Sequence, residues 1–113
     1  MKTFDEILLS EKERAILGKI QESVKAVLPD STIILYGSRA RGNPQEHSDW
    51  DILILTEKVT PEIKDGIYGV LYEIELEHDI IIGPLILPRN EWEHKRFKNH
   101  PIHENIDDEG VLV

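Results

Sequence analysis

Hydrophobic residues along this chain follow two patterns, one with helical spacing and one of short continuous runs. Helical spacing follows the capping box Ser10-Glu11-Lys12-Glu13 and predicts a first helix that ends at Pro29. A second helical stripe follows Thr60-Pro61-Glu62, where proline stands at its favoured first helical position. A third capping signature, Asn90-Glu91-Trp92-Glu93, predicts a last helix that ends near His100-Pro101.

The continuous apolar runs predict β-strands. Two of them cover residues 32–36 and 50–56, and a third strand is expected to begin near Ile80-Ile81-Ile82. Gly83-Pro84 in that third run indicates a bulge or an edge position, because proline cannot donate to a central ladder. The tail, residues 110–113, is expected to add a short strand or to dock on the body. A chain of 113 residues has room for one modest core, so we expect a single domain over residues 1–113.

The first candidate chemistry lies where the run at 32–36 stops at Gly37-Ser38. Glycine lets backbone N–H groups approach a ligand closely, and serine adds a hydroxyl donor. Arg39 and Arg41 follow with forked cationic donors that suit phosphate oxygens. Which arginine contacts phosphate is left open, and one of them can instead pair with a carboxylate as a structural clamp.

The second candidate feature is a pair of acidic residues at the start of the next run. Asp49 and Asp51 are two residues apart, so on a strand their carboxylates point to the same face. Magnesium prefers oxygen ligands and is often held by one or two carboxylates together with substrate phosphates. A phosphate-binding turn beside two convergent carboxylates therefore predicts a magnesium–nucleotide site, although each piece alone is more often a turn, a solvated surface or an edge-protecting charge pair.

Gly37-Ser38, ten intervening residues and Asp49-Trp50-Asp51-Ile52 resemble the signature of the DNA polymerase β-like nucleotidyltransferase superfamily. The form Gly-Ser-x-Ala-Arg-Gly followed by Ser-Asp-x-Asp is similar to its smallest branch, the minimal nucleotidyltransferases. The match is specific over residues 32–56, with a bulky Trp50 at the position between the aspartates. The resemblance implies an α/β (α+β) fold, a small mixed sheet with helices packed on one face.

The resemblance also implies roles for individual residues. Members of the family carry a third acidic residue on a neighbouring strand, and Asp79 is matched to it, with Glu77 as the alternative. Asp49, Asp51 and Asp79 would then be the catalytic residues and hold two Mg²⁺ ions, for which Mn²⁺ can substitute. Gly37 and Ser38, with Arg39 or Arg41, would bind the phosphates of ATP.

Composition narrows the choice of substrates and partners. The net charge is −9, with 13 basic and 22 acidic residues, which disfavours binding to a nucleic-acid polymer because phosphate contacts require clustered Lys and Arg. Cysteine is absent, which excludes disulfides and thiol chemistry and fits a reducing cytoplasm. The apolar runs are too short to span a membrane, and the N-terminus lacks a signal-peptide layout.

The expected reaction is transfer of a nucleoside monophosphate, AMP from ATP, to an acceptor hydroxyl. Minimal nucleotidyltransferases resembling this one are often paired with a HEPN-family protein, as the antitoxin that nucleotidylates its toxin, and we expect such a partner here. Two other functions stay open, a non-catalytic nucleotide-binding interaction module and a small-molecule nucleotidyltransferase of the antibiotic-modifying type. The acceptor, the preferred base and the oligomeric state, including a homo-oligomer, are also left open.

Overall fold

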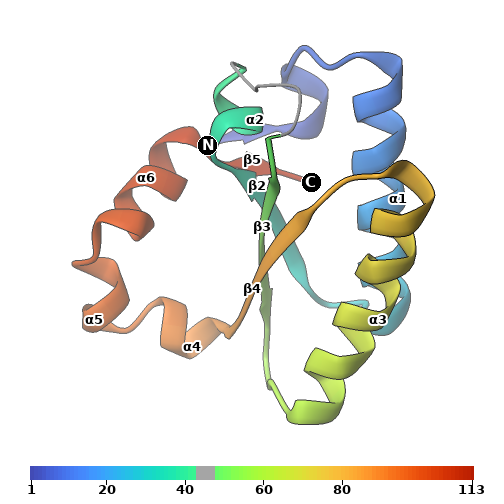
Figure 1. The fold of residues 1–113 in the computed structure, drawn as a ribbon. Helices are drawn as coiled ribbons and strands as arrows, with labels where there is room; N and C mark the ends of the chain where they lie inside the picture. The colour runs from blue at the N-terminus through green and yellow to red at the C-terminus, as the bar shows by residue number, and fades with distance from the viewer. Residues whose placement is uncertain (43–47) are drawn as a thin grey trace.

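The computed structural model describes residues 1–42 and 48–113, and the predicted loop Asn43-Pro44-Gln45-Glu46-His47 lies outside the described residues. The sheet has five strands in the order β1-β5-β2-β3-β4 (Figure 1). Its strands are β1 (Lys2–Thr3), β2 (Thr32–Tyr36), β3 (Trp50–Thr56), β4 (Ile82–Pro88) and β5 (Val111–Leu112). The helices are the 3-10 turn η1 (Phe4–Glu6), α1 (Glu11–Val27), α2 (Ser38–Arg41), α3 (Pro61–His78), α4 (Arg89–Trp92), α5 (Lys95–Lys98) and α6 (Pro101–Glu109).

The two long helices begin where local chemistry predicts. The Ser10 side chain accepts a hydrogen bond from the Glu13 backbone N–H at 3.1 Å, and the Glu13 carboxylate accepts one from the Ser10 N–H at 3.0 Å. This reciprocal capping box satisfies two N–H groups that the first turn of α1 leaves without partners. Thr60 caps α3 with its hydroxyl, which accepts a hydrogen bond from the Ile63 N–H, and Pro61 follows at the first helical position.

The strands at 32–36 and 50–56 have the bounds that the sequence predicts, and β2 and β3 pair antiparallel. β4 pairs parallel with β3 and forms one edge of the sheet, as the Gly83-Pro84 sequence indicates. The pairing aligns Tyr36 with Asp51 and Asp51 with Gly83 across three neighbouring strands. This row crosses the sheet at the position of the predicted site.

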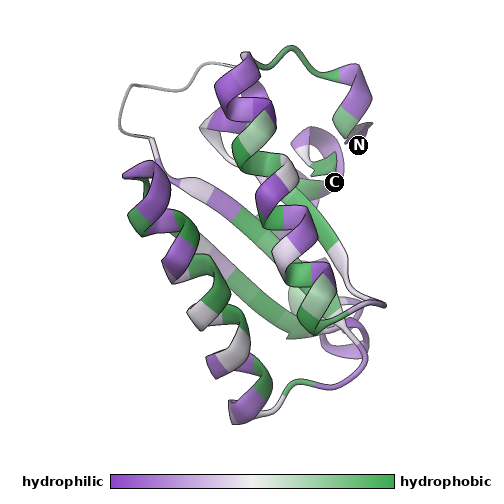
Figure 2. Cartoon of the chain, turned by 90° about the vertical axis from the view of Figure 1, so that its right-hand side faces the viewer, coloured by the Kyte–Doolittle hydropathy of each residue, from purple (hydrophilic) through white to green (hydrophobic). Residues whose placement is uncertain are grey.

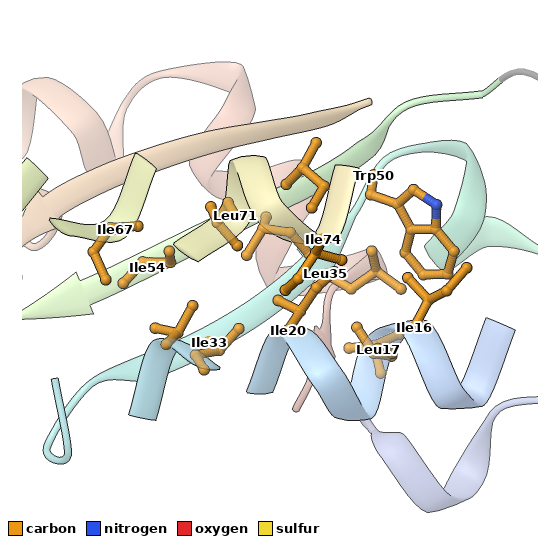
Figure 3. Close-up of a cluster of buried hydrophobic side chains, with 14 of the residues drawn as sticks. Ile16, Leu17, Ile20, Ile33, Leu35, Trp50, Ile54, Ile67, Leu71 and Ile74 are labelled. Carbon is orange, nitrogen blue, oxygen red and sulfur yellow. The ribbon is translucent and has the colours of Figure 1, made fainter. Parts of the chain in front are cut away.

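Helices α1 and α3 cover one face of the sheet, where the largest hydrophobic cluster lies (Figures 1 and 2). Figure 3 shows its side chains, with Trp50 beside Ile16 at one end of the cluster. A second, smaller cluster on the opposite face packs strand residues against Trp92 and Ile106, which come from α4 and α6. The predicted α/β (α+β) fold with a mixed sheet is confirmed, but helices pack on both faces of the sheet and not on one, because α4 and α6 cover the second cluster. Among the described helices, none is both long and apolar enough to cross a bilayer.

The predicted last helix is wrong in its extent. The chain from 89 onwards forms the two short helices α4 and α5, and a longer helix, α6, begins at Pro101, where the sequence predicts an end. His94 and His100 cap the second and third of these helices, each accepting a backbone N–H at its ring Nδ1. The tail strand is confirmed, because β5 pairs with both β1 and β2.

Candidate functional site

Asp51 lies within β3 and faces away from the main core. Its neighbours Trp50 and Ile52 are buried among the core residues beneath α1 and α3, so alternation along the strand directs Asp51 to the α6 face. Asp49 stands just before the strand and is exposed. Partial burial, and secondarily the negative charge of Asp49, raise the pKa of the Asp51 carboxyl, while Arg41 opposes that shift. The two acidic side chains therefore interact, as convergent carboxylates must.

Gly37 forms the turn that brings the phosphate-binding sequence against this carboxylate. Its φ is 77° and ψ is −159°, a conformation that side-chain-bearing residues rarely adopt. A Cβ at this position would stand 2.3 Å from Asp51 Oδ2. The backbone of the turn thus lies directly against the carboxylate, and only glycine allows this approach. One helical turn, α2, follows and ends at Gly42 in the left-handed conformation.

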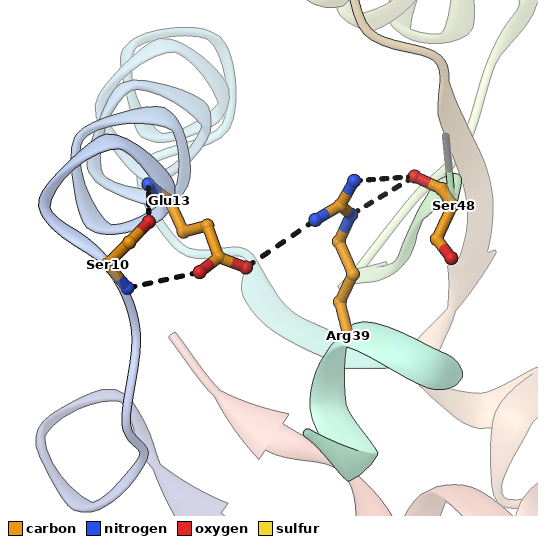
Figure 4. Close-up of polar contacts among 4 residues, drawn as sticks. All are labelled: Ser10, Glu13, Arg39 and Ser48. Atoms are coloured by element: carbon orange, nitrogen blue, oxygen red, sulfur yellow. Dashed lines mark hydrogen bonds and ion pairs between the residues drawn. The ribbon is translucent and has the colours of Figure 1, made fainter. Parts of the chain in front are cut away.

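Arg39 forms a structural clamp. Its Nε and Nη2 donate to the Ser48 carbonyl at 3.1 and 2.8 Å, and its Nη1 lies 3.5 Å from Glu13 Oε2 (Figure 4). The guanidinium carbon also lies 4.4 Å from the centre of the Trp50 ring. Only 10% of the side chain is exposed, so its charge and donors are occupied by protein groups. The sequence leaves two roles open for the arginines, contact with phosphate and a structural clamp, and Arg39 has the structural role.

Arg41 lies on the other side of α2, beside the carboxylates. It pairs with Glu109 at the end of α6, with Nη1 3.2 Å from Oε2, and the two side chains are 46% and 41% exposed. Arg41 and Asp51 line the same cavity, and the arginine charge lowers the pKa of that carboxyl. A solvent-exposed pair of this kind is weakly held. Arg41 is therefore the arginine whose charge is accessible to an incoming anion.

Asp79 is not brought to the other two aspartates. Helix α3 continues to His78, and Asp79 is its C-cap in the left-handed conformation with φ of 53°, three residues before β4 begins. It lines a cavity of about 310 Å³ on the Trp50 side of β3, whereas Asp51 lines a cavity on the opposite face. The alternative, Glu77, is an exposed residue of α3 whose carboxylate lies 3.9 Å from His78 Nε2.

The position on β4 aligned with Asp51 belongs to Gly83. A Cβ built there would lie 3.4 Å from Asp51 Oδ1, so this is the place where an acidic side chain from the neighbouring strand would reach the pair. Within residues 1–42 and 48–113, no three Asp, Glu, His or Cys side chains are grouped so that they could hold a metal ion. Sequence reasoning missed Gly83, because the register of a parallel pair is set by tertiary packing.

Tyr36 completes the described row. It ends β2 opposite Asp51, and burial, followed by the Asp51 charge, raises the pKa of its phenol above the usual value. The hydroxyl therefore stays protonated at neutral pH. It remains a hydrogen-bond donor at the edge of the site.

Two comparisons with known proteins agree with this arrangement. The family model described as "Nucleotidyltransferase domain" matches residues 17–110, which include the Gly37 turn, Asp49, Asp51 and the aligned Gly83. The chain is also 35% identical over 74 residues, 63% of this chain and 75% of the relative, to the protein named "Putative protein adenylyltransferase MJ0141" from Methanocaldococcus jannaschii. The chain belongs to the nucleotidyltransferase domain family and is a minimal nucleotidyltransferase of the DNA polymerase β-like superfamily.

Proposed function

We propose that this enzyme transfers AMP from ATP to a hydroxyl group on a partner protein, with Mg²⁺ bound at Asp49 and Asp51. The observation that carries the proposal is the contact between the Gly37 turn and the Asp51 carboxylate, where a Cβ would stand only 2.3 Å from Oδ2. Nucleotide binding with magnesium requires phosphate donors and carboxylate oxygens at one point. This turn and this strand meet at such a point.

The two carboxylates fit a divalent cation in chemistry and in charge. Both supply oxygen ligands, and the mutual repulsion that contributes to the raised pKa of Asp51 would be relieved by a bound cation. Mg²⁺, or Mn²⁺ in its place, would offset the charge of the transferred phosphate when bound. Because Asp79 lines a cavity on the opposite face, the proposal assigns the metal to Asp49 and Asp51 and gives Asp79 no ligand role.

The remaining residues would bind and orient the donor. The backbone of Gly37, with the Ser38 hydroxyl, would hold the β- and γ-phosphates, and Arg41 would release Glu109 to neutralise phosphate charge. The acceptor oxygen attacks the α-phosphorus in line while the bond to pyrophosphate breaks, so acceptor and leaving group lie on opposite sides. With the phosphates over Gly37, the acceptor would approach from the Gly83 side of Asp51.

Three observations support a protein as the acceptor. The M. jannaschii relative carries the name of a protein adenylyltransferase. The Gly83 side is the β4 edge of the sheet, and next to this edge the exposed α3 side chains Tyr68 and Tyr72 line a cavity together with Ile82 and Pro84 of β4. The excess of 22 acidic over 13 basic residues argues against a polynucleotide acceptor. A HEPN-family toxin is the partner that the family resemblance implies.

The test is co-expression with whichever neighbouring open reading frame encodes a HEPN-like helical protein, followed by intact-mass analysis of that protein. We expect one or more AMP units on the partner with the wild type and with the exposed-site control Asp108→Asn, and none with Asp51→Asn. An unmodified partner, together with label from α-labelled ATP on a small metabolite, would overturn the protein acceptor. ATP binding without any labelled product would instead favour a non-catalytic binding module.

A further inference from the structure

A cavity of about 400 Å³ lies between the end of β2 and α6, next to the candidate site. It shares Gly37, Arg41 and Asp51 with that site, and the rest of its wall comes from Tyr36, from His100 and from α6. A cavity of this size falls within the range of roughly 300–1,000 Å³ that small-molecule pockets occupy. We call it the α6 pocket.

We propose that the α6 pocket binds the nucleoside of the triphosphate donor, an inference that rests on the proposed function. The wall combines the apolar side chains of Ile102 and Ile106 with the amide of Asn105 and the carboxylate of Glu109. A nucleobase has two apolar faces and an edge of adjacent donors and acceptors, and an amide can match such an edge with one donor and one acceptor. A carboxylate is a suitable acceptor for ribose hydroxyls.

The geometry of the reaction distinguishes the nucleoside from the acceptor as the occupant. The pocket is lined by Gly37 and Arg41, which belong to the phosphate side of Asp51. An acceptor must lie on the side of the α-phosphate opposite the leaving pyrophosphate. On that side of Asp51 the neighbouring residue is Gly83, which has no side chain and does not line this pocket. The nucleoside is bonded to the α-phosphate through an oxygen that neither attacks nor leaves. It can therefore extend from Asp51 into the α6 pocket.

The wall of the pocket is held firmly enough to be preformed. Ile106 is buried against the sheet, and a Cβ on Gly110 would lie 2.8 Å from Ile34 Cγ2 on β2, so the end of α6 packs tightly. The His103 ring stacks on Trp92 with centroids 4.3 Å apart, and its Nδ1 lies 3.1 Å from Asp107 Oδ2. The pocket thus requires little ordering of the protein when a ligand binds.

The ion pair between Arg41 and Glu109 links the two halves of the donor site. Its atoms are 3.2 Å apart, and it joins the phosphate side of the cavity to its α6 wall. Phosphate oxygens would compete with the Glu109 carboxylate for Arg41. The carboxylate released in this way becomes available to the ribose, so phosphate binding and nucleoside binding favour each other.

The experiment compares ATP with inorganic tripolyphosphate, each with Mg²⁺, in ¹⁵N-resolved NMR titrations of the full chain. We expect both ligands to shift the amide signals of residues 37–42 and 49–51 and that of Glu109, whose pair with Arg41 either ligand would displace, and ATP alone to shift those of residues 102–106. ATP could instead shift the signals of residues 37–42 and 49–51 and shift those of α6 no more than tripolyphosphate does. The α6 pocket would then be excluded as the nucleoside site. No shift with either ligand would refute the proposed function itself, and the subsite with it.

A substitution adds a quantitative test of the same pocket. Asn105 is exposed, so Asn105→Leu should fold normally while losing the polar match to the base, and its dissociation constant for ATP should rise about fivefold or more. Its affinity for tripolyphosphate should be unchanged. Glu104→Gln on the same helix, outside the pocket lining, is the control. Equal ATP affinities for the wild type and both variants would contradict the assignment.

Discussion

Replacing each of the two arginines of α2 with alanine should give opposite results, because one is a clamp and the other faces the site. Arg39 donates two hydrogen bonds to the Ser48 carbonyl at 3.1 and 2.8 Å and lies over the Trp50 ring. Hydrogen bonds from a charged donor contribute about 1.5–3 kcal/mol, and a desolvated cation–π contact about 1–2 kcal/mol. These terms are not additive, so we expect Arg39→Ala to lower the free energy of unfolding by about 3 kcal/mol.

That loss corresponds to a fall in the thermal midpoint on the order of 10–15 °C for a domain of this size. Arg41→Ala removes an exposed pair with Glu109, which contributes less than about 0.5 kcal/mol, and a solvent-screened attraction to Asp51, so its midpoint should stay close to that of the wild type. Its affinity for Mg²⁺–ATP should instead fall about tenfold, the effect of losing one charge-assisted phosphate contact.

Thermal unfolding by circular dichroism and calorimetric titration at 15 °C measure the two quantities separately. Arg39→Lys sharpens the comparison, since lysine keeps the charge and lacks the fork that reaches the Ser48 carbonyl twice. The division of roles would be refuted if Arg39→Ala kept the wild-type midpoint, or if Arg41→Ala destabilised the fold without weakening ATP binding.

Three further substitutions test the carboxylate site. Gly37→Ala places a side chain on a backbone with φ of 77° and against Asp51, so Mn²⁺ binding measured by calorimetry should be lost. The control is Gly18→Ala, which has open space around its Cβ. It should bind Mn²⁺ normally and be as stable as the wild type or more stable. Burial and a neighbouring carboxylate raise the pKa of Asp51, so the wild type loses stability as pH rises from about 3.9 through the folded-state pKa. In metal-free buffer, Asp51→Asn should therefore melt above the wild type at pH 7, with a difference that disappears towards pH 4, and a constant difference would contradict this electrostatic origin. Gly83→Asp places a third carboxylate beside the pair and should tighten Mn²⁺ binding relative to Gly83→Asn, and equal affinities would show that this position does not reach the metal.

The strands and long helices could be predicted from the sequence because each is specified by neighbouring residues. No distant contact is needed to recognise the capping box at Ser10, the proline after Thr60 or the two apolar runs. The four elements that they predict, α1, α3, β2 and β3, all begin where expected. The Gly37 turn and the Asp49/Asp51 alternation are local in the same sense. Their meeting point depends on the pairing of β2 with β3, which is favoured because the two strands are consecutive along the chain.

The C-terminal helices and the third carboxylate could not be predicted in this way. His94 and His100 act as helix caps through Nδ1, a role for which histidine gives no clear sequence signal. Pro101 is ambiguous as a sequence signal, because proline opens a helix at its first position, as in α3, and also terminates a preceding helix. Because α3 extends to His78, Asp79 lies at the end of a helix, and Gly83 is the residue that lies beside Asp51. Helix boundaries are the feature that sequence patterns define least well.

The unusual tryptophan between the two aspartates follows from the alternation that makes the site. Carboxylates at 49 and 51 on one face require residue 50 to enter the core on the other, and Trp50 is 1% exposed there. Its ring also lies under the guanidinium of Arg39, which in turn holds the carbonyl of Ser48, directly before Asp49. The backbone that presents the carboxylates is thus anchored from the core side of the sheet. A leucine at position 50 would remain buried but would give Arg39 no aromatic face, so this coupling depends on the ring and not on hydrophobicity alone.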